Sequence, residues 1–508
     1  MGLLFLLFAS TIEIHLYSWE ESANLTRLFQ LTVILKKRGS LVSGVTMKLA
    51  DFSSRLKYID LPAEVVLEVK HLLLDSIGCA VAGLKTEKGE ISLAFARRLG
   101  GEPESSIIGT DDKAPADTAA FVNGELFNAL DYDALCSPSA HISPFVMAAP
   151  LALAEAGNVS GRDLITALAV SHEIAIRVAR GLVTGGRFSV YIPEKEMRIT
   201  GPTHGYGSSV FGGVAGAGRI MGFDSEKICH AFGIAGYMCP VPVTMRFAFA
   251  VPSSMSKYLS AGWISKTEVT AVMLAELGYT GDKEILDGEF GFWKSFASEE
   301  WRHEDVVDRL GSKWFLPESI SYKAYPCCGA MHHALDFFYQ IIEENDLDAA
   351  DIERVDVLMN MLADFPLWQN RRIETHIEAQ FSVAYVFAIA AHRVPIGPEW
   401  QKRETFEDPK ILEFMDRVHV KTYADFQGAV GKPIVRVIAG KNGVDGKRTF
   451  SKGDIFTGQN ILGREQLVDK FMGNVSDVVP EKEGEKAIET IFNLEELEDV
   501  SELLRLVR

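Results

Sequence analysis

Residues 62–83 read PAEVVLEVKHLLLDSIGCAVAG, and this stretch decides what kind of fold the chain adopts. Its apolar residues recur three and four positions apart, which is the spacing of one face of an α-helix. Asp60 and Pro62 supply a capping side chain and a first-turn proline, and Gly83 is a stop signal. The sequence therefore predicts a long helix that begins just after Asp60 and ends at Gly83.

Helical spacing continues along most of the first 300 residues. Apolar patterns predict further helices at 115–130, 144–183, 226–235 and 267–277. Residues 208–222 (SSVFGGVAGAGRIMG) are rich in Gly and Ala yet bounded like a helix, which suits a buried helix whose neighbours approach its backbone closely. Because no strands alternate with these helices, we expect a helical domain over residues 47–317.

The pattern changes near Trp314. Residues 352–359 (IERVDVLM) alternate as a strand does, and further strands are predicted at 418–422 and 434–439. Residues 440–447 (GKNGVDGK) predict the turn of a hairpin. With helices predicted at 334–344 and 382–391, residues 318–457 form an α+β lid, and helices in 458–508 return to the helical domain. The predicted fold class is mainly α with an α+β lid.

The first 46 residues predict an atypical N-terminal extension, with Met47 as the functional start. Residues 1–10 (MGLLFLLFAS) are apolar but lack a preceding basic region and are too short to span a bilayer. The six cysteines are scattered and do not resemble a disulfide framework, which favours a reducing compartment. We expect a cytoplasmic protein, with a mitochondrial location as the alternative because of Arg27 and the basic residues 36–38.

The formal net charge of −18 argues against nucleic acid as a partner, because phosphate binding needs a clustered positive surface. No membrane partner is predicted either. If the substrate is an anion, a few local cations must overcome an unfavourable overall field. Individual Lys, Arg and His residues are therefore more informative here than in a basic protein.

Several motif classes are excluded, and one metal-like cluster remains. Phosphate-loop, dinucleotide and GxSxG patterns are absent. His172-Glu173 begins an HExxH pattern whose fifth position is Ile176, which cannot bind zinc. Two thiols and two imidazoles lie in residues 327–333, but adjacent cysteine ligands are awkward for a tetrahedral site. We expect a tight turn feeding a helix there, and neither a metal nor a cofactor.

Three polar stretches interrupt the helical domain where core residues would be expected. Residues 128–141 place Asp131, Asp133 and His141 in one loop. Residues 200–209 precede the glycine-rich helix, and residues 252–258 lead into another apolar helix. The second and third stretches contain Thr203, His204, Ser256 and Lys257, and Lys323 lies at the junction of the two lobes. Taken singly, each residue could be an ordinary turn cap or surface group.

Together these stretches resemble the MmgE/PrpD family, which includes 2-methylcitrate dehydratase, cis-aconitate decarboxylase and iminodisuccinate epimerase. The resemblance runs from about Lys48 to the C-terminus. It rests on LLLDSIGCAVAG (72–83), AAFVNGELFNALDYD (119–133), the His204 loop with its glycine-rich helix, Lys257 with LSAGW, YKAYPCCGAMHHALD (322–336) and EAQFSVAYVFAIA (378–390). It implies a helical domain, an α+β lid and a homodimer.

The resemblance also implies site residues. Asp131, His141 and Lys257 match family catalytic positions, and His204 joins them only if the register shifts by one residue, because Thr203 aligns without gaps. Substrate binding is assigned to Lys323, Thr203, Ser256 and Cys328. Two positions depart from the decarboxylases, since Leu135 replaces a threonine and Ser137 replaces a histidine.

The expected chemistry passes through a carboxylate-stabilised carbanion. Removing water from a citrate-like acid needs a general base, a general acid and cations for the carboxylates. His141 or His204 can supply acid–base chemistry near neutral pH, and the lysines can neutralise carboxylates. The first prediction is a hydro-lyase that dehydrates a small tricarboxylate of the 2-methylcitrate or alkylcitrate type. The alternatives are a cis-aconitate-type decarboxylase, an epimerase or isomerase, and a non-catalytic carboxylate-binding paralogue.

Overall fold

Helices account for most of the computed structural model, which describes residues 44–182, 187–192, 197–202, 206–240, 244–296, 298, 300–359, 361–422, 433–440, 448–452 and 462–508. Val45–Arg508 is one unit and Met1–Gly44 is another. The predicted extension, residues 1–46, therefore lies almost entirely outside the described residues.

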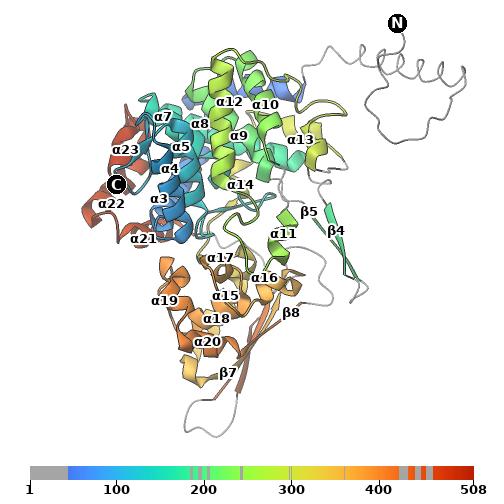
Figure 1. The fold of residues 1–508 in the computed structure, drawn as a ribbon, viewed down its shortest axis with the longest axis vertical. Coiled ribbons are helices and arrows are strands. Elements are labelled where there is room, and N and C mark those ends of the chain that lie inside the picture. Colours follow the sequence, from blue (N-terminus) through green and yellow to red (C-terminus); the bar gives the residue numbers. More distant parts are fainter. Residues whose placement is uncertain are drawn as a thin grey trace, which may run out of the picture. The chain divides into compact units, whose positions relative to one another are not determined.

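Apart from Thr244–Phe249, which lies beside the helices of the second part, the helices before residue 320 lie together as one group in Figure 1. They are α2 (Val45–Arg55), α3 (Ala63–Gly83), α4 (Glu87–Leu99), α5 (Ala116–Phe127), α6 (Ser143–Val146), α7 (Ala148–Ala156), α8 (Gly161–Gly181), α9 (Val210–Ile220), α10 (Ser225–Met238), α11 (Thr244–Phe249), α12 (Ala261–Glu276), α13 (His303–Val307) and α14 (Leu316–Ser319). Helix α3 confirms the predicted end at Gly83.

The predicted capping role of Asp60 is wrong. Asp60 ends a short 3-10 turn, where its carboxylate accepts a hydrogen bond from the Lys57 main-chain N–H at 3.1 Å. Pro62 occupies the N-cap position of α3 in an extended conformation, without a side-chain cap. The carboxylate therefore closes the preceding turn instead of binding the first free N–H groups of the helix.

Short strands also occur within this helical part. Strands β4 (Arg187–Ile192) and β5 (Met197–Pro202) pair antiparallel, which the sequence pattern did not predict. The other short strands are β1 (Ser105–Ser106), β2 (Lys113–Ala114), β3 (Leu135–Cys136) and β6 (Ile320–Ser321). Pairing of β3 with β6 places Leu135 opposite Ser321, and so brings the start of the second lobe beside the loop that follows α5.

The glycine-rich helix α9 is buried, as its composition predicted. A Cβ added at Gly212 would lie 2.2 Å from the main-chain oxygen of Ser171, and one at Gly216 would lie 1.9 Å from the Ser171 hydroxyl oxygen. No side chain fits at either distance. The glycines therefore allow α8 to approach α9 at backbone distance.

The α+β part is built on a four-stranded sheet of order β10-β9-β7-β8. Strands β7 (Ile352–Met359), β8 (Val418–Thr422) and β9 (Ile434–Ala439) have the predicted bounds, and β10 (Arg448–Lys452) pairs antiparallel with β9. The predicted turn, residues 440–447, lies outside the described residues except for Gly440. Strands β7 and β8 are parallel, so the chain must cross over between them, and it does so through helices.

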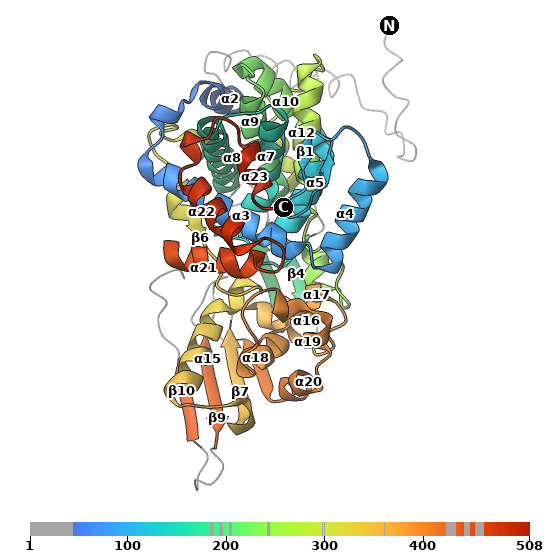
Figure 2. The ribbon, with the colours of Figure 1, turned by 90° about the vertical axis from the view of Figure 1, so that its left-hand side faces the viewer.

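Helices of this part lie beside the sheet and above it in Figure 2. They are α15 (His332–Glu344), α16 (Pro366–Gln369), α17 (His376–Ala379), α18 (Val383–Ala391), α19 (Arg403–Phe406) and α20 (Pro409–Met415). The fold is thus mainly α with a smaller α+β part, as predicted.

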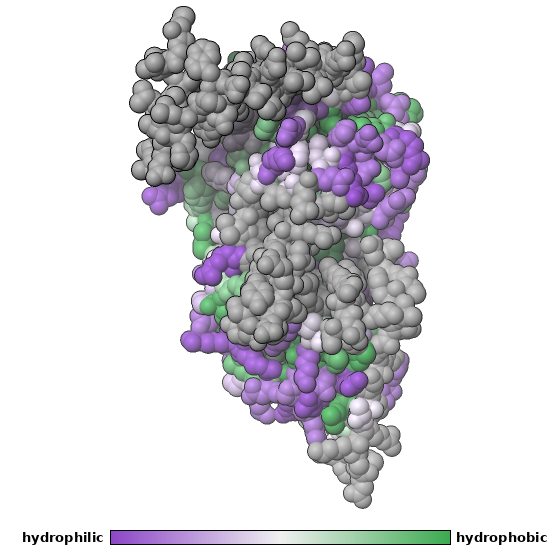
Figure 3. Space-filling view, turned by 90° about the vertical axis from the view of Figure 1, so that its right-hand side faces the viewer, coloured by the Kyte–Doolittle hydropathy of each residue, from purple (hydrophilic) through white to green (hydrophobic). Residues whose placement is uncertain are grey.

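The chain ends in three helices, α21 (Arg464–Val475), α22 (Glu481–Phe492) and α23 (Ser501–Arg505). Helix α21 packs on α3, where a Cβ at Gly78 would lie 3.2 Å from the Phe471 ring. Among the described residues, no helix is both long and apolar enough to cross a membrane. On the face drawn in Figure 3, hydrophobic residues form separate patches among hydrophilic ones.

Glu268, on α12, is a fully buried acid without a counter-charge among the described residues. Neither carboxyl oxygen has a hydrogen-bond partner within the described chain, and a Cβ at Gly213 of α9 would lie 1.9 Å from the carboxyl carbon. Burial raises the pKa of Glu268 well above its usual 4.5. A pKa that is raised by folding contributes stability below the unfolded-state pKa, and this contribution is lost as the pH rises through the folded-state pKa.

Glu268→Gln should therefore flatten the pH dependence of thermal stability. Between mildly acidic and mildly alkaline pH, the wild-type midpoint should fall further than that of the variant by a few degrees, because ~1 kcal/mol corresponds to about 2–4 °C in domains of 150–250 residues. Glu276→Gln, at an exposed position of the same helix, is the control. Equal pH slopes in all three proteins would contradict a protonated Glu268.

Candidate active site

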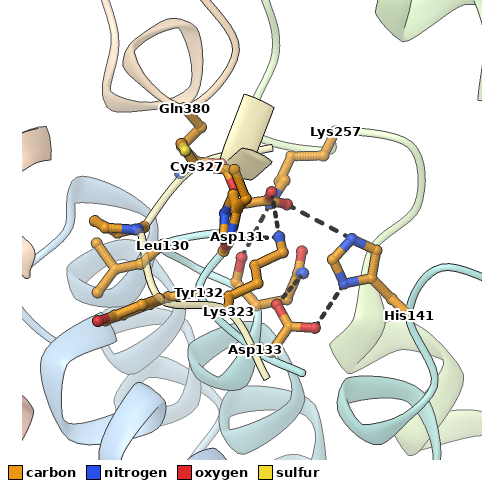
Figure 4. Close-up of polar contacts among 12 residues, drawn as sticks. Leu130, Asp131, Tyr132, Asp133, His141, Lys257, Lys323, Cys327 and Gln380 are labelled. Carbon is orange, nitrogen blue, oxygen red and sulfur yellow. Dashed lines mark hydrogen bonds and ion pairs between the residues drawn. The ribbon is translucent and has the colours of Figure 1, made fainter. Parts of the chain in front are cut away.

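The site is centred on Asp131, in the loop that follows α5 (Figure 4). Its side chain is 1% exposed and accepts two charge-assisted hydrogen bonds. Lys257 Nζ lies 2.8 Å from Oδ1, and Lys323 Nζ lies 2.6 Å from Oδ2. One carboxylate thus joins a loop of the helical part to two distant segments of the chain.

Both lysines are fully buried at the side chain and make a second bond to the same loop. Lys257 Nζ donates to the main-chain oxygen of Asn128 at 3.1 Å, and Lys323 Nζ donates to that of Asp131 at 2.6 Å. Asp131 and Lys257 have φ values of 52° and 50°, in the left-handed region that few non-glycine residues adopt. Such strain persists only where surrounding contacts hold it, as these bonds do.

The three charges shift one another's pKa. Burial alone would raise the pKa of Asp131, but the two ammonium groups outweigh it and hold the pKa well below 3.8. Burial lowers the pKa of Lys257 to about 8 in spite of Asp131, and Lys88 adds to this effect. For Lys323, burial is outweighed by Asp131 and Asp133, so its pKa is raised. Lys257 is therefore the cation that loses its proton more easily.

His141 forms a dyad with Asp133. Its Nδ1 lies 2.6 Å from Asp133 Oδ2, and Asn128 Nδ2 donates to the other carboxylate oxygen at 2.8 Å. Because an ionised carboxylate can only accept, Nδ1 carries a proton and Nε2 is left as the reactive end. His141 Nε2 lies 3.8 Å from Asp131 Oδ1, too far for a hydrogen bond. Burial opposes ionisation of Asp133, but His141 outweighs it and lowers the carboxyl pKa.

Aromatic side chains from separate elements enclose this polar group. Tyr258 stacks on the His141 ring at 5.2 Å and donates to Asp131 Oδ1 at 3.3 Å. Tyr206 lies 4.7 Å from Tyr258, and Phe381 of the second lobe lies 5.7 Å from Lys257 Nζ. These rings exclude water from one side of the cluster, which strengthens its electrostatic interactions.

The loop itself is held through five consecutive main-chain oxygens, and each accepts a bond from a distant side-chain nitrogen. The pairs are Asn128 with Lys257 (3.1 Å), Ala129 with Gln380 (2.7 Å), Leu130 with Gln401 (2.7 Å), Asp131 with Lys323 (2.6 Å) and Tyr132 with Lys470 (2.7 Å). Both lobes and the C-terminal helices take part. Sequence reasoning missed Gln380, Gln401 and Lys470 because polar residues in helices and loops are ordinarily solvated.

The predicted site residues divide into three groups. The first group, which the structure brings together in one buried cluster, consists of Asp131, His141, Lys257 and Lys323. Cys328 is half-buried, its main-chain N–H donates to the Gln380 main-chain oxygen at 2.9 Å, and burial raises its thiol pKa to about 11.

Thr203 and His204 lie outside the described residues, and Ser256 is exposed. Within the described chain, no contact joins Ser256 to this cluster. The substrate-binding roles assigned to Thr203 and Ser256, and the catalytic role of His204, stay predictions.

The two departures from the decarboxylase pattern occupy different surroundings. Leu135 packs against the turn after Cys328, since a Cβ at Gly329 would lie 2.6 Å from Leu135 Cδ1. Ser137 is exposed, and its main-chain N–H donates to the Ser319 oxygen at 2.9 Å. Leu135 thus contributes an apolar contact between the two lobes.

The metal-like cluster forms a turn, as the preferred interpretation predicted. His332 Nε2 contacts the main-chain oxygen of Cys327 at 3.2 Å, and a 3-10 turn over Gly329–Met331 leads into α15 at His332. Among the described residues, no group of three or more His, Cys, Asp or Glu side chains is arranged to hold a metal ion.

Glu173 is buried, and its Oε2 accepts the main-chain N–H groups of Phe315 and Leu316.

His376, at the start of α17, is a further buried histidine that sequence reasoning missed. Its side chain is 5% exposed and its Nε2 has no hydrogen-bond partner in the described chain. Burial lowers its pKa to about 3, with smaller effects from Lys88 and Lys257, so the ring is neutral. Buried and solvated histidines occur in the same sequence patterns, so the spacing of residues does not reveal that His376 is buried.

Comparison with known proteins gives consistent matches. The family models described as the MmgE/PrpD N-terminal domain and the MmgE/PrpD C-terminal domain match residues 47–304 and 325–496. Proteins named cis-aconitate decarboxylase are similar over 92% of this chain. The human protein is 25% identical with 95% of its length covered, the mouse protein 26% with 94%, and that of Aspergillus terreus 24% with 96%.

Asp131→Asn should destabilise the protein strongly, because it removes the charge that both buried ammonium groups share. Breaking a buried ion pair from one side costs about 3–5 kcal/mol, and we expect that loss in the free energy of unfolding measured by denaturant titration. The control is Asp112→Asn, whose exposed pair with Arg97 should contribute less than ~1 kcal/mol. Equal small losses in both variants would contradict the central role of Asp131.

Proposed function

The chain belongs to the MmgE/PrpD family, and we propose that it is a carboxy-lyase that removes CO2 from a cis-aconitate-like tricarboxylate. The observation that carries this proposal is the similarity to proteins named cis-aconitate decarboxylase over 92% of the chain. It favours the alternative drawn from the sequence over the first prediction, dehydration of a 2-methylcitrate-like acid. The charges around Asp131 support the same substrate class.

The two buried lysines are the groups that bind the substrate carboxylates in this proposal. An ammonium group has three N–H donors, and Lys257 and Lys323 each use two of them within the described chain. One donor therefore remains on each lysine for a substrate carboxylate. The positive charges of Lys257 and Lys323 balance the negative charges of the two aspartates of the site. A protonated His141 therefore makes the cluster net positive, which suits a tricarboxylate.

His141 is the proposed proton donor. In decarboxylation the bond between carbon and the leaving carboxylate breaks, CO2 departs, and the electron pair stays on carbon, where a neighbouring carboxylate delocalises it. The carbon then takes the proton from His141 Nε2, and the ring recovers a proton from water. Asp133, bound to Nδ1, orients the ring and stabilises its charged form. Lys257 and Lys323 offset the negative charge that develops on the substrate.

The direct test is incubation of the purified chain with cis-aconitate and, separately, with 2-methylcitrate, followed by proton NMR and CO2 detection. Release of CO2 with a five-carbon unsaturated dicarboxylate supports the proposal. Loss of water from 2-methylcitrate alone would replace it with the dehydratase. No change with either acid would favour a non-catalytic carboxylate-binding protein.

His141→Ala should lower kcat by about 10²–10⁴, the range for loss of a general acid or base. The melting temperature of the variant should change no more than it does for other substitutions at buried positions. The loss of kcat then reflects the chemical step and not unfolding. The control is His303→Ala, because His303 is exposed on α13. Turnover by His141→Ala equal to that of the control would remove His141 from the mechanism.

The rate should also fall as the pH rises through about 8, the pKa of Lys257. Below that pH the ammonium is charged and binds carboxylate, and above it the neutral amine does not. Lys257→Arg keeps its charge at all these pH values and should lose this alkaline limb, whatever its absolute rate. A limb that is unchanged in Lys257→Arg would assign the titration to another group.

A further inference from the structure

Lys470, on α21, is a buried lysine that the mechanism above does not use. Its side chain is 4% exposed, and all three of its N–H donors are engaged. They bind Asp75 Oδ1 at 2.6 Å, the main-chain oxygen of Tyr132 at 2.7 Å and the main-chain oxygen of Lys323 at 3.1 Å. One ammonium therefore connects the loop of Asp131 to the segment of Lys323.

Asp75, on α3, completes the contact from the other side. Its Oδ1 holds Lys470, and its Oδ2 accepts the main-chain N–H of Ala134 at 3.1 Å. Tyr132 and Ala134 flank Asp133, so the Lys470–Asp75 pair binds the loop on both sides of the His141 partner. The Lys470 ammonium also lies 3.8 Å from the Tyr132 ring centre, and the Tyr132 hydroxyl donates to the Ala324 oxygen at 3.2 Å.

We infer that Lys470, together with Asp75, is a positioning residue that sets the distance between the Asp131 loop and Lys323. The inference rests on the proposed function, because it assigns the pair a part in that reaction. Lys470 acts through the backbone of the residues beside Asp131 and Asp133, whereas Lys257 and Lys323 bind Asp131 directly.

A stabilising role alone does not explain a buried pair at this place. Desolvation of two charges offsets most of their attraction, so a buried ion pair contributes little stability compared with apolar residues of similar size. What the pair adds is directional bonding to three main-chain groups of the site. Displacement of reacting groups by about 1 Å can reduce a rate 10²-fold, so such bonding bears on kcat more than on folding.

The test is the double variant Lys470→Met/Asp75→Asn, because Lys470→Met alone would leave a buried carboxylate without its cation. The amide can still accept the Ala134 N–H, and Met fills the space of the lysine stem. The matched control is Lys70→Met on the same helix α3, since Lys70 Nζ binds the Phe492 main-chain oxygen and makes no described contact with the loop.

We expect the double variant to lose about 10- to 100-fold in kcat with little change in KM, while Lys70→Met keeps both values. Hydrogen exchange of residues 128–134 should rise in the double variant only. A folded double variant with wild-type kcat, or a kcat loss that Lys70→Met shares, would overturn the inference. If the wild-type chain turns over no tricarboxylate, the proposed function fails, and the exchange of residues 128–134 alone decides whether the pair holds the loop.

Discussion

A single buried carboxylate, Asp131, is the constraint on which the rest of the site depends. It is 1% exposed and neutralises two ammonium groups that belong to distant segments of the chain. Neither Lys257 nor Lys323 could stay buried and charged without it, because an isolated ammonium in the interior shifts its pKa and loses its proton. One set of charges therefore fixes the positions of the Asp131 loop, the Lys257 segment and the Lys323 segment. The same charges also suit an anionic substrate.

The loop that carries Asp131 has little secondary structure of its own, yet side chains from several segments hold its backbone. Gln380 and Gln401 reach it from the second lobe, and Lys470 reaches it from the C-terminal helices. Consequently a change in any of these segments can reach Asp131 and Asp133 through hydrogen bonds. This arrangement gives the second lobe a direct part in shaping the site, beyond covering it. It also explains how two left-handed residues, Asp131 and Lys257, can be maintained.

The proposed chemistry needs few groups, and the structure brings most of them together. Decarboxylation requires cations and one proton donor, which Lys257, Lys323 and the His141–Asp133 dyad supply. Leu135, where the decarboxylase pattern has a threonine, packs against the Gly329 turn and so removes one polar group near the acidic loop. The binding of substrate is therefore expected to differ in detail from that of the relatives, while the buried charge cluster is common to dehydration and decarboxylation alike.

Several helix and strand positions followed from the sequence by itself, because period 3.6 and period 2 patterns report which faces are buried. The single helix predicted at 144–183, however, is divided into α6, α7 and α8. Helix α3 ends where predicted, and β7 to β9 have the predicted bounds. Asp60 was misjudged because a carboxylate can close a turn as readily as cap a helix, and the β4–β5 hairpin has no clear alternation. The sequence also placed Asp131 and His141 in one polar stretch, and Lys257 and Lys323 in two other segments. Only the tertiary structure decided that Asp131 binds both lysines, that Asp133 orients His141, and that Lys470, Gln380 and Gln401 hold the loop. The reason is physical. Apart from the Asp133–His141 contact, whose residues are eight positions apart, these bonds join residues more than a hundred positions apart. Burial, which determines whether a common polar residue is charged or orients its neighbours, exists only once the chain has folded.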